Sequence, residues 1–156
     1  ALRYAGNPSL VSRAHFARYL VEIGISKNVH DVFLHYLARG KPGYVEHVWA
    51  TLEEAMGWIK GAGGLAVIAH PGRYRLSQAE MDILFDRFRD LGGDAIEVSC
   101  GAHDGGQVLA FARLARKFGL MASRASDFHG PEDSPIDLGR APPLPPDLTP
   151  VWTHLT

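Results

Sequence analysis

The sequence predicts an α/β protein with parallel strands that are joined by helices. From residue 51 onward, segments with helical spacing of apolar residues alternate three times with short apolar runs. A helix between two strands returns the chain to the same end of the sheet, so the strands run parallel with right-handed connections. Residues 1–49 instead predict only helices and turns. We therefore expect a helical unit over 1–49, followed over 50–156 by half of an α/β barrel or one flank of an open sheet.

Two helices are expected in the first unit, over residues 11–23 and 29–38, with a turn over 41–44. Ser9 or Ser12 can cap the first helix, and Gly24 can end it. Apolar side chains recur on one face of each helix and are expected to point inward. They are Phe16, Tyr19, Leu20 and Ile23 in the first helix, and Val32, Phe33, Tyr36 and Leu37 in the second.

The second unit is expected to contain helices over 52–60, 78–90 and 107–118. Thr51 with Glu54 forms a capping-box pattern, Ser77 can cap the next helix, and Gly119 ends the last. Strands are expected over 65–69, 94–100 and 120–123, and the proline-rich tail is expected to be extended. The residues expected to be buried are Leu52, Ala55, Met56, Ile59, Met81, Leu84, Phe85, Phe88, Leu109, Ala112, Leu114 and Ala115, with Leu138, Leu144, Val151 and Trp152 anchoring the tail.

Composition excludes some classes of partner. The chain has 156 residues, a net charge of -1 and 46% hydrophobic residues, so it has no general attraction for nucleic acid or an anionic membrane. No apolar run reaches the roughly 18 residues of a membrane span. A single cysteine, Cys100, indicates a reducing, cytoplasmic location. We expect Cys100 to be a small residue at a strand end; a reactive thiol is the alternative.

Polar side chains follow two of the expected strands. His70 comes directly after the run 65–69, where Pro71 and Gly72 end the strand. Asp127 and His129 follow the run 120–123. The carboxyl ends of parallel strands meet at one edge, and imidazole and carboxylate groups bind divalent metals. The sequence therefore predicts a metal site there, although turn and capping roles for these residues remain open.

Other residues have weaker claims. Glu97 is either a site residue or an interior group, and His103 lies in the following loop, from which it could face the site. Arg13 can bind an anion if it lies where the first helix begins, because backbone amides are free there. Its alternative role is an ordinary charge on the surface.

Several motifs resemble those of a known family. Ala-His-Pro-Gly-Arg-Tyr over 69–74, Ile-Glu-Val over 96–98 and Ser-Asp-Phe-His over 126–129 resemble the later motifs of the PHP (polymerase and histidinol phosphatase) superfamily. The segments 12–18 and 40–45 resemble one bacterial branch of it. That branch acts on nucleoside 3′,5′-bisphosphates and on the 5′ ends of short RNA. The resemblance extends over nearly the whole chain.

The resemblance implies a distorted (β/α)7 barrel, of which this chain is the C-terminal part, with a small helical insertion from residue 11 to 49. It implies a trinuclear site of divalent metals, commonly manganese, with zinc, iron or magnesium as alternatives. His70, Asp127 and His129 would be metal ligands. Arg13 would hold the substrate phosphate, with His15, Lys41 and Arg73 as weaker contacts. The reaction would be hydrolysis of phosphate monoesters of nucleotides or short oligonucleotides.

The chain also departs from the family. It contains no His-x-His motif, so we expect a portion of a longer protein that binds metal poorly by itself. Ala125 stands where the family has glycine, and a positive φ there would cost up to about 1 kcal/mol. A non-catalytic module that binds phosphate or nucleotide, and another metal hydrolase of the amidohydrolase type, remain as alternative functions.

Overall fold

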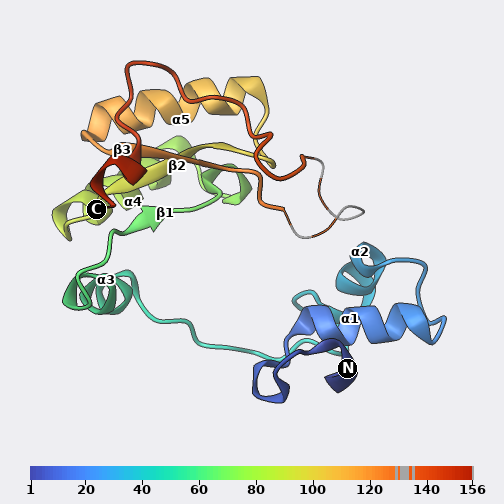
Figure 1. The fold of residues 1–156 in the computed structure, drawn as a ribbon. Helices are drawn as coiled ribbons and strands as arrows, with labels where there is room; N and C mark the ends of the chain where they lie inside the picture. The colour runs from blue at the N-terminus through green and yellow to red at the C-terminus, as the bar shows by residue number, and fades with distance from the viewer. Residues whose placement is uncertain (129, 131–133, 135, 156) are drawn as a thin grey trace. The chain divides into compact units, whose positions relative to one another are not determined.

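The computed structural model describes residues 1–128, 130, 134 and 136–155. It divides into two compact units, Ala1–Trp49 and Ala50–Thr156 (Figure 1). The first unit contains α1 (Arg13–Glu22) and α2 (Val29–Val32), which continues as a π-helical turn over Phe33–Leu37. Short 3-10 turns lie at Leu2–Tyr4 and Pro8–Leu10.

The core of the first unit is small and differs in part from the expected one. Ala17, Val32 and Leu37 are buried, and Leu20, Phe33 and Tyr36 pack against them. The prediction that Phe16, Tyr19 and Ile23 point inward is wrong within this unit, because each is 38–49% exposed. α2 has a single helical turn before the π-helical segment, and so small a unit has too few apolar side chains to cover these large residues.

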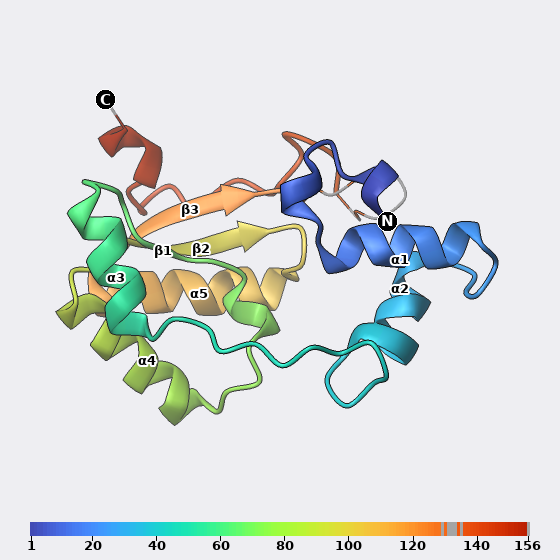
Figure 2. The ribbon, with the colours of Figure 1, turned by 90° about the horizontal axis from the view of Figure 1, so that it is seen from below.

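The second unit is built on a three-stranded sheet with the predicted parallel pairing, and its strand order is β1-β2-β3 (Figure 2). The strands are β1 (Val67–Ile68), β2 (Ala95–Cys100) and β3 (Met121–Ala125). β1 is shorter than the expected run over 65–69. Ile68 pairs with Ile96, which pairs with Ala122, and a β-bulge lies between Glu97 and Ser99. Since all three strands point the same way, the segments that follow them emerge at one edge.

Three helices accompany this sheet: α3 (Leu52–Gly61), α4 (Gln78–Asp90) and α5 (Gly105–Phe118). The capping box at Thr51 and the cap at Ser77 are confirmed, and Ser77 forms a full capping box with Glu80. Gly119 ends α5 in a left-handed conformation. Asp104 caps α5 by accepting a hydrogen bond from Gln107 N. Polar caps therefore fix where each helix begins.

Side chains from all three helices meet the strands in one core. Phe85 and Phe118 stack with ring centroids 5.6 Å apart, and Met56, Met81 and Ile96 are buried beside them. Leu109 was expected in this core but is 57% exposed, and Phe111 is buried instead. α5 packs along β2, and the face of the helix that meets this strand carries Phe111 and not Leu109. Ile59, at 37% exposed, also lies largely outside the core.

The tail lies along β3. Ala122 N donates to Thr149 O, Ala122 forms a parallel bridge with Pro150, and Ser99 Oγ donates to Pro142 O. Val151 begins a short 3-10 helix (Val151–His154) and is buried, while Leu144 packs against the core. The expected anchors Leu138 and Trp152 are exposed, because backbone hydrogen bonds rather than these side chains attach the tail.

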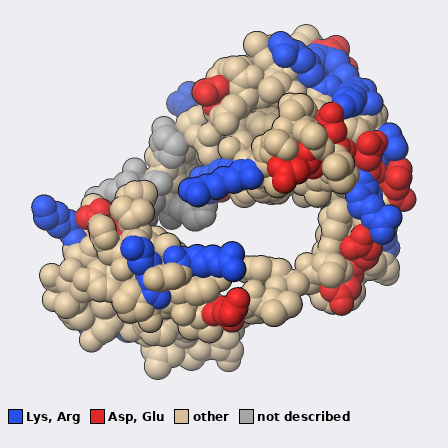
Figure 3. Space-filling view, turned by 180° about the vertical axis from the view of Figure 1, so that it is seen from behind, with Lys and Arg blue, Asp and Glu red and all other residues tan. Residues whose placement is uncertain are grey.

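Charges of opposite sign lie beside one another on the second unit (Figure 3). Lys117 pairs with Asp82, Arg116 with Asp147, and Arg87 with Glu53. Such exposed pairs contribute little to stability, but they neutralise basic side chains on the outer helices. Within the part of the chain that the structure describes, no helix is long and apolar enough to span a membrane.

Candidate functional site

The segment after β1 makes a tight turn that begins at His70. His70 has φ 48° and ψ 46°, which is the left-handed region, and Pro71–Arg73 forms a 3-10 turn. His70 N donates to Glu97 Oε2 at 2.7 Å, and Tyr74 Oη donates to Ala69 O at 2.7 Å. The buried carboxylate on β2 and the phenol therefore hold the turn from two sides.

Asp127 meets this turn from the end of β3. Its Oδ1 lies 3.1 Å from His70 Nε2, and its Oδ2 pairs with an Arg73 guanidinium nitrogen at 2.8 Å. The structure thus brings together three residues singled out from the sequence, from two segments that are far apart along the chain. His70 is partly exposed, whereas the Asp127 side chain is only 12% exposed. The carboxylate is therefore oriented by two basic side chains at a largely shielded position.

Backbone strain is concentrated at these same positions. Among the described residues, His70 and Asp127 (φ 56°) are the only ones other than glycine with positive φ. A left-handed conformation costs an L-residue roughly 1–2 kcal/mol and persists only where its surroundings enforce it. Ala125, suspected of such strain, lies in β3, so that concern was wrong. The strain falls two residues later, on the proposed ligand.

This strain can be measured by comparing two substitutions of Asp127. Asp127→Gly and Asp127→Ala both remove the carboxylate, but only glycine adopts positive φ without penalty. We expect the glycine variant to be more stable by about 1 kcal/mol in urea unfolding. As a control, Ser123 in regular β3 should show the opposite order, with alanine more stable than glycine. Equal or reversed stability at position 127 would contradict the assigned strain.

The donor set fits a divalent cation. His70 Nε2 lies within hydrogen-bonding distance of Asp127 Oδ1, at 3.1 Å, and imidazole nitrogen and carboxylate oxygen are both ligands of divalent cations. Glu97 Oε2 lies 3.9 Å from the same nitrogen. Donor atoms of His70, Glu97 and Cys100 all lie within 4.8 Å of one another. The donor atoms of His70, Glu97 and Cys100 are therefore close enough together to bind one metal ion.

Cys100 is the weakest member of this group. It is buried, as expected of a small residue at a strand end. Burial raises the pKa of its thiol, and the negative charges of Glu97 and Asp127 raise it further. Because the thiolate is the form that binds metal, Cys100 favours the protonated, non-ligating state. Burial, and then the charge of Glu97, likewise raises the pKa of Tyr74, which stays a hydrogen-bond donor.

Three further side chains contact this turn, and two of them had only weak claims from the sequence. Glu97 is 5% exposed and binds the His70 backbone, and His103 is 8% exposed and lies against Gly72. The sequence signals for them were a charged residue within an apolar strand, for Glu97, and a histidine in the loop after that strand, for His103. Tyr74 was missed altogether, since an aromatic residue in a turn has no distinctive pattern. His129, predicted as a ligand, lies outside the described residues.

The remaining predicted contacts belong to the first unit. Arg13 is the first residue of α1, as its expected role at the helix start requires, and its guanidinium carbon lies 5.9 Å from the Phe33 ring centroid. His15 has a capping role that was not expected: its Nδ1 accepts from Ser12 N at 2.9 Å. Lys41 lies exposed in a turn.

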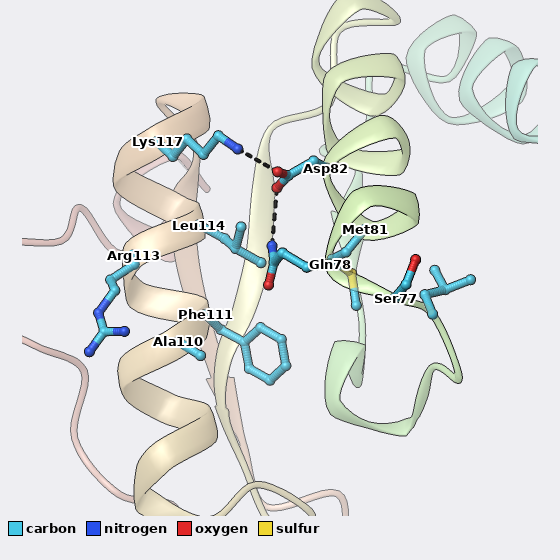
Figure 4. A pocket seen from close by; sticks show the side chains of 10 residues that line it. Ser77, Gln78, Met81, Asp82, Ala110, Phe111, Arg113, Leu114 and Lys117 are labelled. Carbon is cyan, nitrogen blue, oxygen red and sulfur yellow. Dashed lines mark hydrogen bonds and ion pairs between the residues drawn. The ribbon is translucent and has the colours of Figure 1, made fainter.

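A separate cavity of about 360 Å³ lies between α4 and α5 (Figure 4). Asp82 bridges it, accepting from Gln78 and pairing with Lys117. Met81 and Phe111 form part of its apolar wall. Since no predicted site residue lines it, we assign the chemistry to the strand edge and not to this cavity.

Comparison with known proteins gives close relatives. No family model matches the chain. It is 48% identical over 155 residues to a 3′,5′-nucleoside bisphosphate phosphatase of Chromobacterium violaceum, covering 99% of this chain and 54% of that protein. It is 48% identical to the 5′-3′ exoribonuclease Rnm of Salmonella typhimurium, covering 97% and 51%, and 47% identical to that of Escherichia coli, covering 91% and 48%.

Solved structures agree with these relatives. An amidohydrolase from Chromobacterium violaceum, crystallised with sulfate and without metal, matches with a TM-score of 0.89 and 48% identity, over 99% of this chain and 53% of that one. A Bifidobacterium adolescentis protein assigned to the metal-dependent phosphoesterases matches with a TM-score of 0.69 and 26% identity, over 96% and 50%. The chain is therefore similar to proteins named as a nucleoside bisphosphate phosphatase, exoribonucleases and a metal-dependent phosphoesterase, and it spans about half the length of these relatives.

Proposed function

We propose that the protein containing this chain is a metal-dependent phosphoesterase. Its substrates would be phosphate monoesters of nucleotides, namely nucleoside 3′,5′-bisphosphates such as adenosine 3′,5′-bisphosphate, and the 5′ ends of short RNA. The observation that carries the proposal is the contact between His70 and Asp127, two strained residues that meet at the carboxyl edge of the sheet. Relatives named phosphatase and exoribonuclease support the substrate class.

We assign metal binding to His70, Asp127 and His129. Glu97 would act on this group through the backbone of His70. In the complete protein we propose a trinuclear site within a distorted (β/α)7 barrel, with manganese as the first candidate and zinc, iron or magnesium as alternatives. A bound divalent cation supplies charge neutralisation for the phosphoryl oxygens and a hydroxide near neutral pH. Cytoplasmic location remains part of the proposal.

The residues of this chain would orient both ligand and substrate. Arg73 pairs with Asp127 Oδ2, which leaves Oδ1 directed toward His70. The Arg73 side chain is 59% exposed, so its remaining N–H groups can donate to a phosphate. The first unit would be an insertion in the barrel that presents Arg13 and Lys41 to the substrate, while His15 would chiefly cap α1. Sulfate bound to the amidohydrolase relative supports an oxyanion site in this family.

The proposal is tested by measuring phosphate release from adenosine 3′,5′-bisphosphate and from a short RNA with a 5′ phosphate. Manganese should support release from both, and a chelator should abolish it. Nucleotide binding without release would favour a non-catalytic binding module. Hydrolysis of an amide in place of a phosphate ester would favour the amidohydrolase alternative, which the description of one structural relative raises.

Arg13 should contribute mainly to substrate binding. A charge-assisted hydrogen bond contributes about 1.5–3 kcal/mol, so Arg13→Ala should raise KM roughly 10–100-fold with little change in kcat. Arg18→Ala is a matched control, because Arg18 is also exposed on α1 but was not assigned to substrate. Steady-state kinetics on the bisphosphate decide the matter, and an unchanged KM would remove Arg13 from the site.

A further inference from the structure

We propose that His103 is a positioning residue that locks the turn over 70–73 and thereby aims His70 and Arg73 at Asp127. The inference rests on the proposed function, which gives those three residues their roles. It concerns a side chain whose described partners are the Val98 carbonyl, the Gly72 amide and the Phe111 ring. His103 lies in the loop between β2 and α5 and is 8% exposed.

Its two ring nitrogens have opposite partners. Nδ1 lies 3.1 Å from Val98 O, and a carbonyl can only accept, so Nδ1 carries a proton. Nε2 lies 3.3 Å from Gly72 N, which can only donate, so Nε2 is unprotonated. The surroundings therefore select one neutral tautomer. The ring also packs on Phe111, with centroids 4.7 Å apart.

This arrangement completes the hydrogen bonding of the turn. His70 N donates to Glu97, Gly72 N to His103, Arg73 N to His70 O, and Tyr74 N to Pro71 O. Proline has no N–H, so every backbone donor from 70 to 74 has an acceptor. Two of these acceptors are side chains from β2 and the loop after it. The left-handed conformation of His70 persists only if surrounding contacts hold it. His103 provides one such contact at Gly72, which lies between His70 and Arg73.

The fit between ring and turn is close. A Cβ built on Gly72 would lie 2.8 Å from His103 Cδ2 and 2.9 Å from Gln107 Nε2. Such distances are shorter than real contacts, so glycine is required for the turn to approach the ring. A ring that only filled space beside Phe111 would not need an acceptor aimed at the Gly72 amide. The hydrogen bond is thus the feature that separates positioning from packing.

The first test is the tautomer, measured in the full-length protein by long-range proton–nitrogen NMR. His103 should show a protonated Nδ1 and a bare Nε2 as a single species. The opposite tautomer, or a mixture of both, would overturn the inference. This readout does not depend on any enzymatic activity.

The second test compares His103→Leu with His103→Gln. Leucine fills the space beside Phe111 but offers no acceptor, whereas the glutamine carbonyl can reach the position of Nε2. Removing an interaction that orients a ligand typically costs 10–100-fold, so His103→Leu should lower kcat by about that factor with a much smaller change in KM. His103→Gln should recover about tenfold. Arg113→Ala, which changes an exposed side chain of α5 outside the turn, should leave kcat unchanged.

The outcomes separate this inference from the proposed function. Wild-type activity with equal kcat in the leucine and glutamine variants would overturn the inference alone. Absence of activity in the wild type would overturn the proposed function, and amide exchange would then decide the inference. Amides of residues 70, 72 and 73 should exchange at least tenfold faster in His103→Leu than in His103→Gln. Equal exchange rates would overturn the positioning role.

Discussion

Replacing His70 or Asp127 by alanine should abolish metal-dependent phosphate release while leaving the fold intact. Each change removes a proposed metal ligand, and residues that merely orient such ligands already contribute 10–100-fold. We therefore expect losses of at least about a hundredfold in kcat/KM for the bisphosphate. Both residues lie beyond strand ends, and neither is part of the apolar core. Circular dichroism should accordingly remain that of the wild type.

His154→Ala is the matched control, since His154 is an exposed histidine of the same unit and is outside the assigned site. It should retain wild-type activity. Manganese binding, measured by calorimetry in the full-length protein, should weaken in the His70 and Asp127 variants and not in the control. Retention of more than about a tenth of the activity in either ligand variant would count against its role.

Gly101→Ala should be nearly as damaging, although it removes no functional group. A Cβ at Gly101 would lie 2.0 Å from Ser126 O, which is a backbone atom one residue before Asp127. The segment after β3 must then move by about 1 Å, and displacement of that size in an active site can cost a hundredfold in rate. We expect a loss of about that size in kcat/KM, with stability lowered by roughly 1–3 kcal/mol.

Gly105→Ala is the control that tests whether the steric clash at residue 101 causes the loss of activity in Gly101→Ala. Gly105 begins α5, its φ is not positive, and a Cβ there would meet nothing within 4 Å. Alanine at this position should leave activity unchanged and stability equal or slightly higher. Kinetics and urea unfolding of both variants give the comparison. Full activity in Gly101→Ala would show that the approach of residues 101 and 126 does not set the position of Asp127.

Local chemistry was readable from the sequence. The capping residues Thr51 and Ser77 predicted where α3 and α4 begin, and Gly119 predicted where α5 ends, because caps act within a few residues. The alternation of helices and strands predicted parallel pairing, and the structure adds the order β1-β2-β3. The position of His70 and Asp127 at one sheet edge followed from that topology, and their contact at 3.1 Å agrees with it.

What the sequence determined by itself was which segments form helices and strands, their parallel pairing and the residue types gathered at the strand ends. Only the tertiary structure decided that Phe111 rather than Leu109 is buried, that the strain falls on Asp127 rather than Ala125, and that Glu97 and His103 hold the His70 turn. The physical reason is how far apart along the chain the interacting residues lie. Caps and periodicity act between near neighbours, whereas burial, positive φ and hydrogen bonds between distant segments depend on which elements pack together.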